Sequence, residues 1–233
     1  AAAYSTSVSQ IGLNFRKLLK PGLLCLVPFM LIVNQPDLGT ALLLVLITGS
    51  ITLFVKLERR VLITLISVGI SIIPLFWMVL KDYQKERILI FINPDRDPLG
   101  SGYHIIQSKI AIGSGMLTGK GFLKGTQNAL SFLPEQHTDF IVSVLAEEWG
   151  LLGVSALLLL YFILILWCFN IAYNCRNMFG SILAFGCTAM IFWQILINYG
   201  MVTGLLPVVG VPLPLVSYGG SSFITNMTAL GIL

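Results

Sequence analysis

The chain has 233 residues, of which 56% are hydrophobic and 10% are charged, and its mean hydropathy is +0.90. Water-soluble domains usually carry about 25% charged residues, so the composition excludes an ordinary soluble globule. The apolar content also excludes a disordered chain. The 14 Lys and Arg residues outnumber the 10 Asp and Glu residues by too little to indicate a nucleic-acid-binding protein. A polytopic membrane protein is the class that remains.

Apolar runs along the chain predict an all-α bundle of about six transmembrane helices, since a helix needs about 20 apolar residues to cross a bilayer. The runs cover residues 21–33, 38–55, 61–80, 149–169, 182–206 and 215–233. The first run is short and is interpreted as the end of a tilted span. Because the chain does not begin with Met and ends inside an apolar run, we expect it to be part of a longer protein.

Basic residues in the short loops predict the orientation in the membrane. They lie before the first run, between the second and third, and between the fourth and fifth: Arg16, Lys17, Lys20, Lys56, Arg59, Arg60 and Arg176. The opposite short connections, residues 34–37 and 207–214, contain no Lys or Arg. By the positive-inside rule the basic loops face the cytoplasm. The long loop of residues 81–141 is therefore expected on the outer face.

This long loop is charged, rich in Gly and interrupted by Pro. Ile106 and Ile110 lie one helical turn apart, which indicates a short helix over residues 104–112 at the membrane surface, or a packed connector without chemistry. The closely spaced glycines of residues 113–125 would let backbone N–H groups approach a phosphate, or would simply make a mobile loop. The 4 Cys and 2 His residues show no metal-ligand spacing, so no zinc site is predicted.

Four motifs occur in the order in which a known family carries them. They are residues 35–40 (QPDLGT), 97–113 (DPLGSGYHIIQSKIAIG), 132–141 (FLPEQHTDFI) and 211–221 (VPLPLVSYGGS). In these motifs the chain resembles the SEDS family of bacterial cell-wall polymerases, and more the elongation (RodA) type than the division type. The resemblance implies a fold of about ten spans, of which residues 1–233 are the C-terminal part of a single membrane-embedded domain. Residues 81–141 would be its catalytic loop.

The resemblance also implies a function, that of a peptidoglycan glycosyltransferase in the bacterial cytoplasmic membrane. Such an enzyme polymerises lipid II for cell elongation and shape. A sugar hydroxyl displaces undecaprenyl pyrophosphate from the lipid-linked glycan with inversion at the anomeric carbon. The implied partners are membrane lipid and a class B penicillin-binding protein, which is a transpeptidase, and no nucleic acid is expected. The alternatives are a lipid II flippase, whose ionisable residues should lie near the midplane of its helices, and a non-enzymatic scaffold for the penicillin-binding protein.

The sugar hydroxyl needs a positioned base, and the resemblance gives this role to Asp139. If Trp149 lies at the headgroup level, Asp139 stands about ten residues, or about 15 Å of helix, further out, where lipid-linked sugars would be. A second interpretation comes from the residues alone. Asp139 precedes a helix and would serve as its N-cap, although Val142 in place of Glu or Gln leaves it without a capping box.

Seven more side chains are predicted to bind the substrate: Lys109, Gln107, Lys120, His137, Glu147, Asp37 and Ser217. A lysine, or a divalent cation (Mg²⁺ or Mn²⁺) with ligands unknown from the sequence, would balance the charge of the leaving pyrophosphate. Competing interpretations remain for several of these residues. In these alternatives the lysines are simply solvated and bind no substrate, Glu147 belongs to a solvated helix start, and Asp37 serves as an N-cap. The Ser-Gly cluster that begins at Ser217 serves helix packing, or a broken helix that lines a polar cavity.

Overall fold

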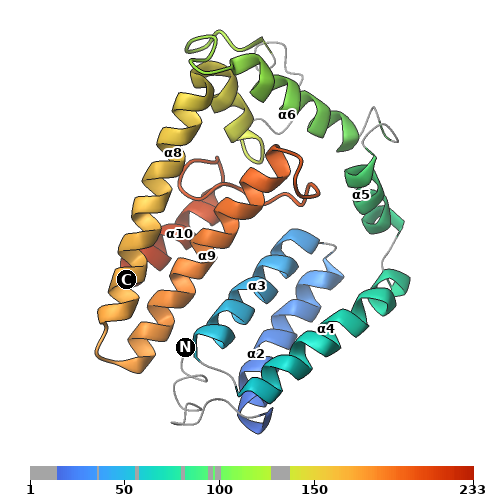
Figure 1. Ribbon diagram of the computed structural model, residues 1–233, viewed down its shortest axis with the longest axis vertical. Coiled ribbons are helices and arrows are strands. Elements are labelled where there is room, and N and C mark those ends of the chain that lie inside the picture. Colours follow the sequence, from blue (N-terminus) through green and yellow to red (C-terminus); the bar gives the residue numbers. More distant parts are fainter. Residues whose placement is uncertain are drawn as a thin grey trace. The chain divides into compact units, whose positions relative to one another are not determined.

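The computed structural model describes residues 15–35, 37–55, 58–79, 82–93, 97, 101–126 and 137–233. Within these ranges all regular structure is helical (Figure 1). The helices are α2 (Phe15–Asn34), α3 (Leu38–Phe54), α4 (Arg59–Val79), α5 (Asp82–Ile92), α6 (Ser101–Gly115), α8 (Ile141–Asn174), α9 (Met178–Val202) and α10 (Gly220–Ile232). The predicted all-α fold is confirmed. Pro36, Lys56, residues 98–100 and residues 132–136, which the sequence analysis used, lie outside the described residues.

Each predicted apolar run falls on a helix, but some boundaries differ. Helix α8 begins at Ile141, eight residues before the apolar run, as expected for a helix that follows Asp139, but it is interrupted at Gly150, which was not predicted. Helix α10 begins at Gly220 rather than at residue 215, because Leu215 has a φ of 65°, which is incompatible with an α-helix. In the long loop the expected short helix is confirmed as the longer α6, whereas α5 was not predicted.

The described chain falls into two compact units, and both include parts of α8 and α9. Unit 1 contains α2, α3, α4 and residues 167–193, and unit 2 contains α5, α6 and residues 137–166 and 194–231. The prediction that residues 1–233 form a single domain, with residues 81–141 as a catalytic loop, stays a prediction.

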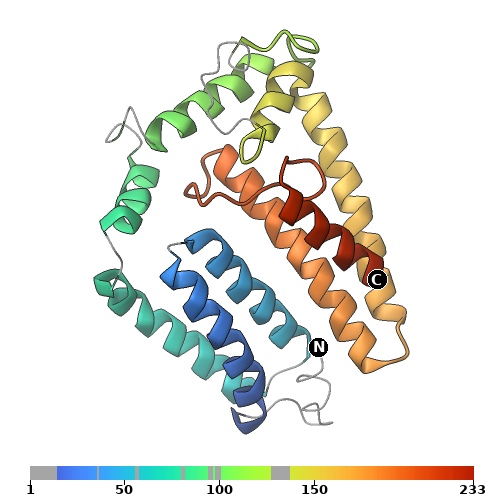
Figure 2. The same cartoon turned by 180° about the vertical axis from the view of Figure 1, so that it is seen from behind.

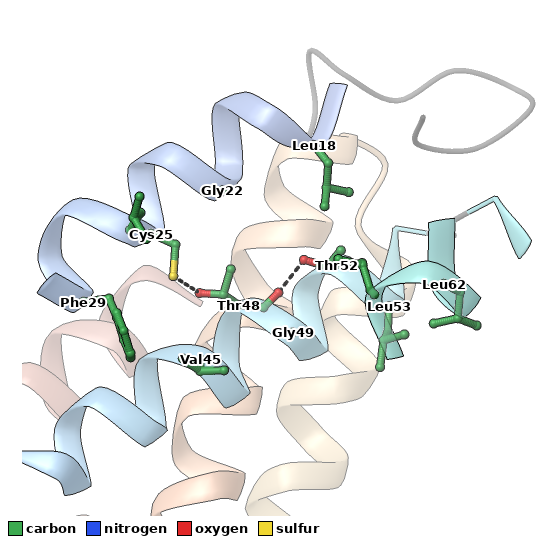
Figure 3. Close-up of a pocket in the computed structure, with 12 residues that line it drawn as sticks. Leu18, Gly22, Cys25, Phe29, Val45, Thr48, Gly49, Thr52, Leu53 and Leu62 are labelled. Carbon is green, nitrogen blue, oxygen red and sulfur yellow. Dashed lines mark hydrogen bonds between the residues drawn. The ribbon is translucent and has the colours of Figure 1, made fainter. Parts of the chain in front are cut away.

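Unit 1 is an apolar helix assembly with a few internal polar contacts. Helix α2 packs on α3, and the Cys25 Sγ lies 3.2 Å from the Thr48 Oγ1. The three helices α2, α3 and α4 line an apolar pocket of about 520 Å³ (Figure 3). On the other side of α3, the Trp193 Nε1 donates a hydrogen bond to the Ser50 Oγ at 2.8 Å.

Helices α8 and α9 are long and apolar enough to cross a membrane, and α2 and α3 contain shorter apolar stretches. Only 11% of the most apolar 18-residue stretch of α8 is buried. A core helix of a soluble protein, by contrast, would be mostly buried. Exposed side chains on α8 include Leu151, Leu159, Leu160 and Phe162. A continuous apolar surface of this kind is expected where a helix faces lipid, as the composition predicts.

Asp37 caps α3, and its N-cap interpretation is confirmed. Its Oδ1 accepts a hydrogen bond from the Thr40 N–H at 3.1 Å, and its Oδ2 accepts one from the Thr40 Oγ1 at 2.6 Å.

We expect Asp37→Ala to lower the free energy of unfolding by about 1 kcal/mol. Asp37→Asn should keep the free energy of unfolding close to that of the wild type, because both Asp and Asn cap helices well. Unfolding of the micelle-solubilised full-length protein checks this; equal stability of all three proteins would contradict it. The predicted substrate contact of Asp37 stays a prediction.

Candidate active site

Asp139 lies in the turn of residues 137–140, directly before α8 in unit 2. The turn is anchored by Phe140, whose side chain is buried. The Phe140 carbonyl accepts hydrogen bonds from the N–H groups of Ser143 at 2.9 Å and Val144 at 3.4 Å. Phe140 therefore occupies the N-cap position of α8, and Asp139 precedes it by one residue. Since assigned helix ends vary by about one or two residues, the N-cap and the general base both stay predictions for Asp139.

The turn is held by the segment that connects α9 to α10. The Ser217 Oγ donates a hydrogen bond to the Thr138 carbonyl at 2.6 Å and accepts one from the Leu213 N–H at 2.8 Å. The Tyr218 N–H donates to the His137 carbonyl at 2.9 Å. Ser217 precedes α10, so the Ser-Gly cluster leads into a helix instead of interrupting one. The hydroxyl of Ser217 positions the turn, and its predicted substrate contact stays a prediction.

Asn198 of α9 supports Asp139 itself. Its Nδ2 donates hydrogen bonds to the carbonyl of Asp139 at 3.0 Å and to that of Val211 at 2.8 Å, and its side chain is fully buried. Gly210 lies against the carboxylate: a Cβ there would be 3.4 Å from the Asp139 Oδ2, and its φ of 71° favours glycine. Asn198 was not predicted as a site residue, although an amide inside an apolar run is a signal of a buried polar contact.

A cavity of about 630 Å³ opens beside this turn. Its lining includes His137 and Ile141 from one side and Ser217, Tyr218 and Phe223 from the other. The Tyr218 side chain is 81% exposed. The volume lies in the range of about 300–1,000 Å³ that is usual for small-molecule sites. The structure thus brings two predicted substrate-binding residues, His137 and Ser217, to one cavity, next to the turn that carries Asp139.

Glu147 is not part of a solvated helix start, and that interpretation is wrong. Its side chain is fully buried, and its Oε1 lies 2.7 Å from the Lys120 Nζ. The same oxygen accepts hydrogen bonds from the Thr126 N–H at 2.8 Å and the Thr126 Oγ1 at 3.0 Å. A carboxylate at this depth needs such partners, because burial of an unpaired charge is very costly. The structure therefore brings Lys120 and Glu147 together as an ion pair.

The remaining two predicted residues, Gln107 and Lys109, lie on α6. This helix is fixed by the buried Ser108, whose Oγ donates to the Val202 carbonyl at 2.6 Å and lies 2.8 Å from the Ser143 Oγ. Lys109 is exposed, and its side chain crosses over Gly204, where a Cβ would lie 2.7 Å from the Nζ. Gln107 is half-buried. The ammonium group of Lys109 can reach an anion in solvent, as a pyrophosphate contact requires.

Fold and site together define a polytopic helical membrane protein with an acidic turn held beside a cavity. The comparisons with known proteins are specific. The family of FtsW, RodA and SpoVE, described as "Cell cycle protein", matches residues 1–233. The chain therefore belongs to this family. The family is the one that the motifs predicted, where it was called SEDS, so that prediction is confirmed.

The chain is 51% identical over 211 residues to the peptidoglycan glycosyltransferase MrdB of Escherichia coli K12, covering 90% of this chain and 57% of that protein. It is 46% identical over 168 residues to the peptidoglycan glycosyltransferase RodA of Treponema pallidum, covering 72% and 38%. The chain thus spans a little more than half the length of the first relative, and its match covers less than half of the second.

The fold is similar to that of a solved chain from a study described as "Structural coordination of polymerization and crosslinking by a peptidoglycan synthase complex". The TM-score is 0.77 at 35% identity, over 99% of this chain and 64% of that chain. The predicted polytopic helical fold is confirmed by this similarity.

Proposed function

We propose that the protein is a peptidoglycan glycosyltransferase that polymerises lipid II into glycan strands for cell elongation and shape. The observation that carries this proposal is the Asp139 turn, whose backbone carbonyls are hydrogen-bonded by Asn198, Ser217 and Tyr218 beside a cavity of about 630 Å³. A general base needs such fixed geometry. The names of the two relatives, both peptidoglycan glycosyltransferases, support the reaction class.

In the proposed reaction the 4-hydroxyl of an acceptor sugar attacks the anomeric carbon of the glycan that undecaprenyl pyrophosphate carries. Asp139 takes the hydroxyl proton while the new carbon–oxygen bond forms. The bond from the anomeric carbon to the pyrophosphate oxygen breaks, and the lipid pyrophosphate leaves with the electron pair from the opposite face, so the configuration inverts. Lys109 balances the negative charge that develops on the leaving group. His137 binds the substrate at the cavity wall.

An interruption of α8 at Gly150, where φ is 64° and ψ is −162°, supports a proposal for the height of the site in the membrane. The part after Gly150 has about 24 residues, or a length of roughly 36 Å, which exceeds the hydrocarbon thickness of about 30 Å. We propose that the break at Gly150 stands at the headgroups of the outer leaflet of the cytoplasmic membrane, because residues 141–149 turn back there beside the residues that follow Gly150 (Figures 1 and 2). The Asp139 turn bonds to Ser217, and the neighbouring Pro214 carbonyl accepts a hydrogen bond from the Tyr161 hydroxyl, eleven residues beyond Gly150 in α8. Asp139 therefore lies on the inner side of the break, and the expectation that it stands about 15 Å further out than Trp149 is wrong.

A divalent cation, Mg²⁺ or Mn²⁺, would add positive charge at the pyrophosphate. Within the part of the chain that the structure describes, no three His, Cys, Asp or Glu side chains come together to hold one. These residues therefore do not fit a metal ion bound by protein side chains alone, and no step above passes through a cation. The rate of polymerisation before and after treatment with EDTA tests a cation requirement.

The proposed partner is a class B penicillin-binding protein that crosslinks the strands. The study that contains the similar solved chain is described as one of a peptidoglycan synthase complex that coordinates polymerization and crosslinking, which supports this choice.

The proposal is tested with purified full-length protein in liposomes that contain lipid II. A polymerase forms glycan strands without a partner. A flippase moves lipid II to the other leaflet and forms no strands. A scaffold does neither and only changes the activity of an added penicillin-binding protein. We expect strands, and their absence at a lipid II concentration that saturates binding would overturn the proposal.

A further inference from the structure

The interruption of α8 at Gly150 is filled by the segment that follows α6, residues 116–126, which lies where the two parts of α8 meet in both views (Figures 1 and 2). Before the break, the carbonyls of Glu147 and Glu148 accept hydrogen bonds from the N–H groups of Lys120 and Gly121, each at 2.9 Å. These carbonyls would otherwise bond to the next turn of α8. The segment therefore replaces part of the helical hydrogen bonding.

After the break the bonding is reversed. The N–H groups of Leu151 and Leu152 donate to the carbonyls of Met116 and Leu117, at 2.9 Å and 3.1 Å. The two backbones touch here: a Cβ on Gly119 would lie 2.1 Å from the Glu148 carbonyl oxygen. The direction in which the first part of α8 leaves Gly150 therefore depends on the position of the segment 116–126.

One ion pair, between the partly exposed Lys120 and the buried Glu147, joins this segment to the first part of α8. The Lys120 Nζ contacts the Glu147 Oε1 at 2.7 Å and donates to the Thr126 Oγ1 at 2.9 Å. Gly125 also leaves no space beside the carboxylate, since a Cβ there would lie 2.8 Å from the Glu147 Oε2. If the ammonium group left to bind a substrate, the fully buried carboxylate would lose a charged contact of 2.7 Å, which is unfavourable.

We propose that the Lys120–Glu147 pair is a positioning lock. It fixes the segment 116–126 on α8 and thereby the angle at Gly150. Together with Asn198 and Ser217, which hold the turn of residues 137–140, it sets the position of Asp139 at the N-terminal end of residues 141–149. This inference rests on the proposed function, because it acts through the proposed base. Lys120 and Glu147 are then positioning residues, and the substrate contacts expected for them from the sequence are replaced by a contact with each other.

The expected effect on the reaction is large because residues 141–149 act as a lever. They extend over about 13 Å, so a tilt of about 5° at Gly150 would displace their N-terminal end by about 1 Å. A displacement of about 1 Å in a catalytic geometry can cost about 100-fold in rate.

The test uses the full-length protein with the substitutions Lys120→Met and Glu147→Gln, each of which removes one charge with little change in size. We expect faster hydrogen exchange of the amides of residues 120, 121, 151 and 152. We also expect kcat per folded molecule to fall at least about tenfold while the KM for lipid II stays within about twofold. Lys120→Arg, which keeps the charge, should retain most of kcat. The control is Lys85→Met, which removes the same charge from α5 and should change neither quantity.

Two results would overturn the lock. An increase in KM with kcat unchanged would make Lys120 a substrate-binding residue. Faster exchange with both kinetic constants unchanged would leave the pair a purely structural role. If the wild-type protein forms no strands, the proposed function fails and the positioning role fails with it, whereas the exchange measurement still shows whether the pair holds the segment.

Discussion

Replacing Asp139 with asparagine is expected to lower the rate of glycan polymerisation by about 100- to 10,000-fold, the usual contribution of a general base. The amide has nearly the shape of the carboxylate but cannot take the proton of the acceptor hydroxyl. The fold should persist, because Asn198 and Ser217 bond to the backbone carbonyls of residues 139 and 138 and not to the side chain that changes. Strand formation from lipid II by the purified full-length variant measures the effect.

The matched control is Glu86→Gln, which makes the same chemical change at an exposed carboxylate on α5. Its rate should equal that of the wild type. If Asp139→Asn formed strands as fast as this control, Asp139 would not be the base. A loss of rate that followed only from loss of folded protein would not support the assignment either, so both proteins are compared at equal folded concentration.

The second large effect is expected for Gly119→Ala. A Cβ at this position would lie 2.1 Å from the Glu148 carbonyl oxygen, and the φ of 76° is unfavourable for alanine. The strained conformation costs about 1–3 kcal/mol, and the overlap requires the segment 116–126 to leave its place on α8. We expect the free energy of unfolding to fall by about 3–5 kcal/mol in total, measured by unfolding in micelles.

Gly113→Ala on α6 is the control for this substitution, because a Cβ there meets nothing within 4 Å. In a helix interior this change should stabilise the protein by roughly 0.5–1 kcal/mol. If Gly119→Ala and Gly113→Ala had the same stability, the close docking of residues 116–126 on α8 would be refuted.

The helices were largely predictable from the sequence because the bilayer thickness sets the length of an apolar run. The helix after Asp139 was expected, but its break at Gly150 and the burial of its two glutamates were not. Its Glu147 and Glu148 are typical of a solvated helix start, and both are buried only because the segment 116–126 covers them. The start of α10 was also missed, since nothing in the sequence indicates a positive φ at Leu215, a residue type that rarely adopts it.

The candidate site was predicted in part. The motifs led to His137, Asp139 and Ser217, which the structure brings to one turn and its supporting segment. The partner of Glu147 was missed because Lys120 lies 27 residues away in the sequence and the contact depends on the break at Gly150. Asn198 was missed because periodicity does not distinguish a lipid-facing position of α9 from one that faces the Asp139 turn.

The central claim is that Asp139 acts in bond formation and not in substrate binding. The most direct test is a single-turnover measurement, in which lipid II bound to the full-length protein is quantified and the glycosidic bond it forms is then followed in time. For Asp139→Asn the account predicts binding equal to that of the wild type and bond formation slower by about 100-fold or more. Weaker binding, with an unchanged rate for each bound complex, would contradict it.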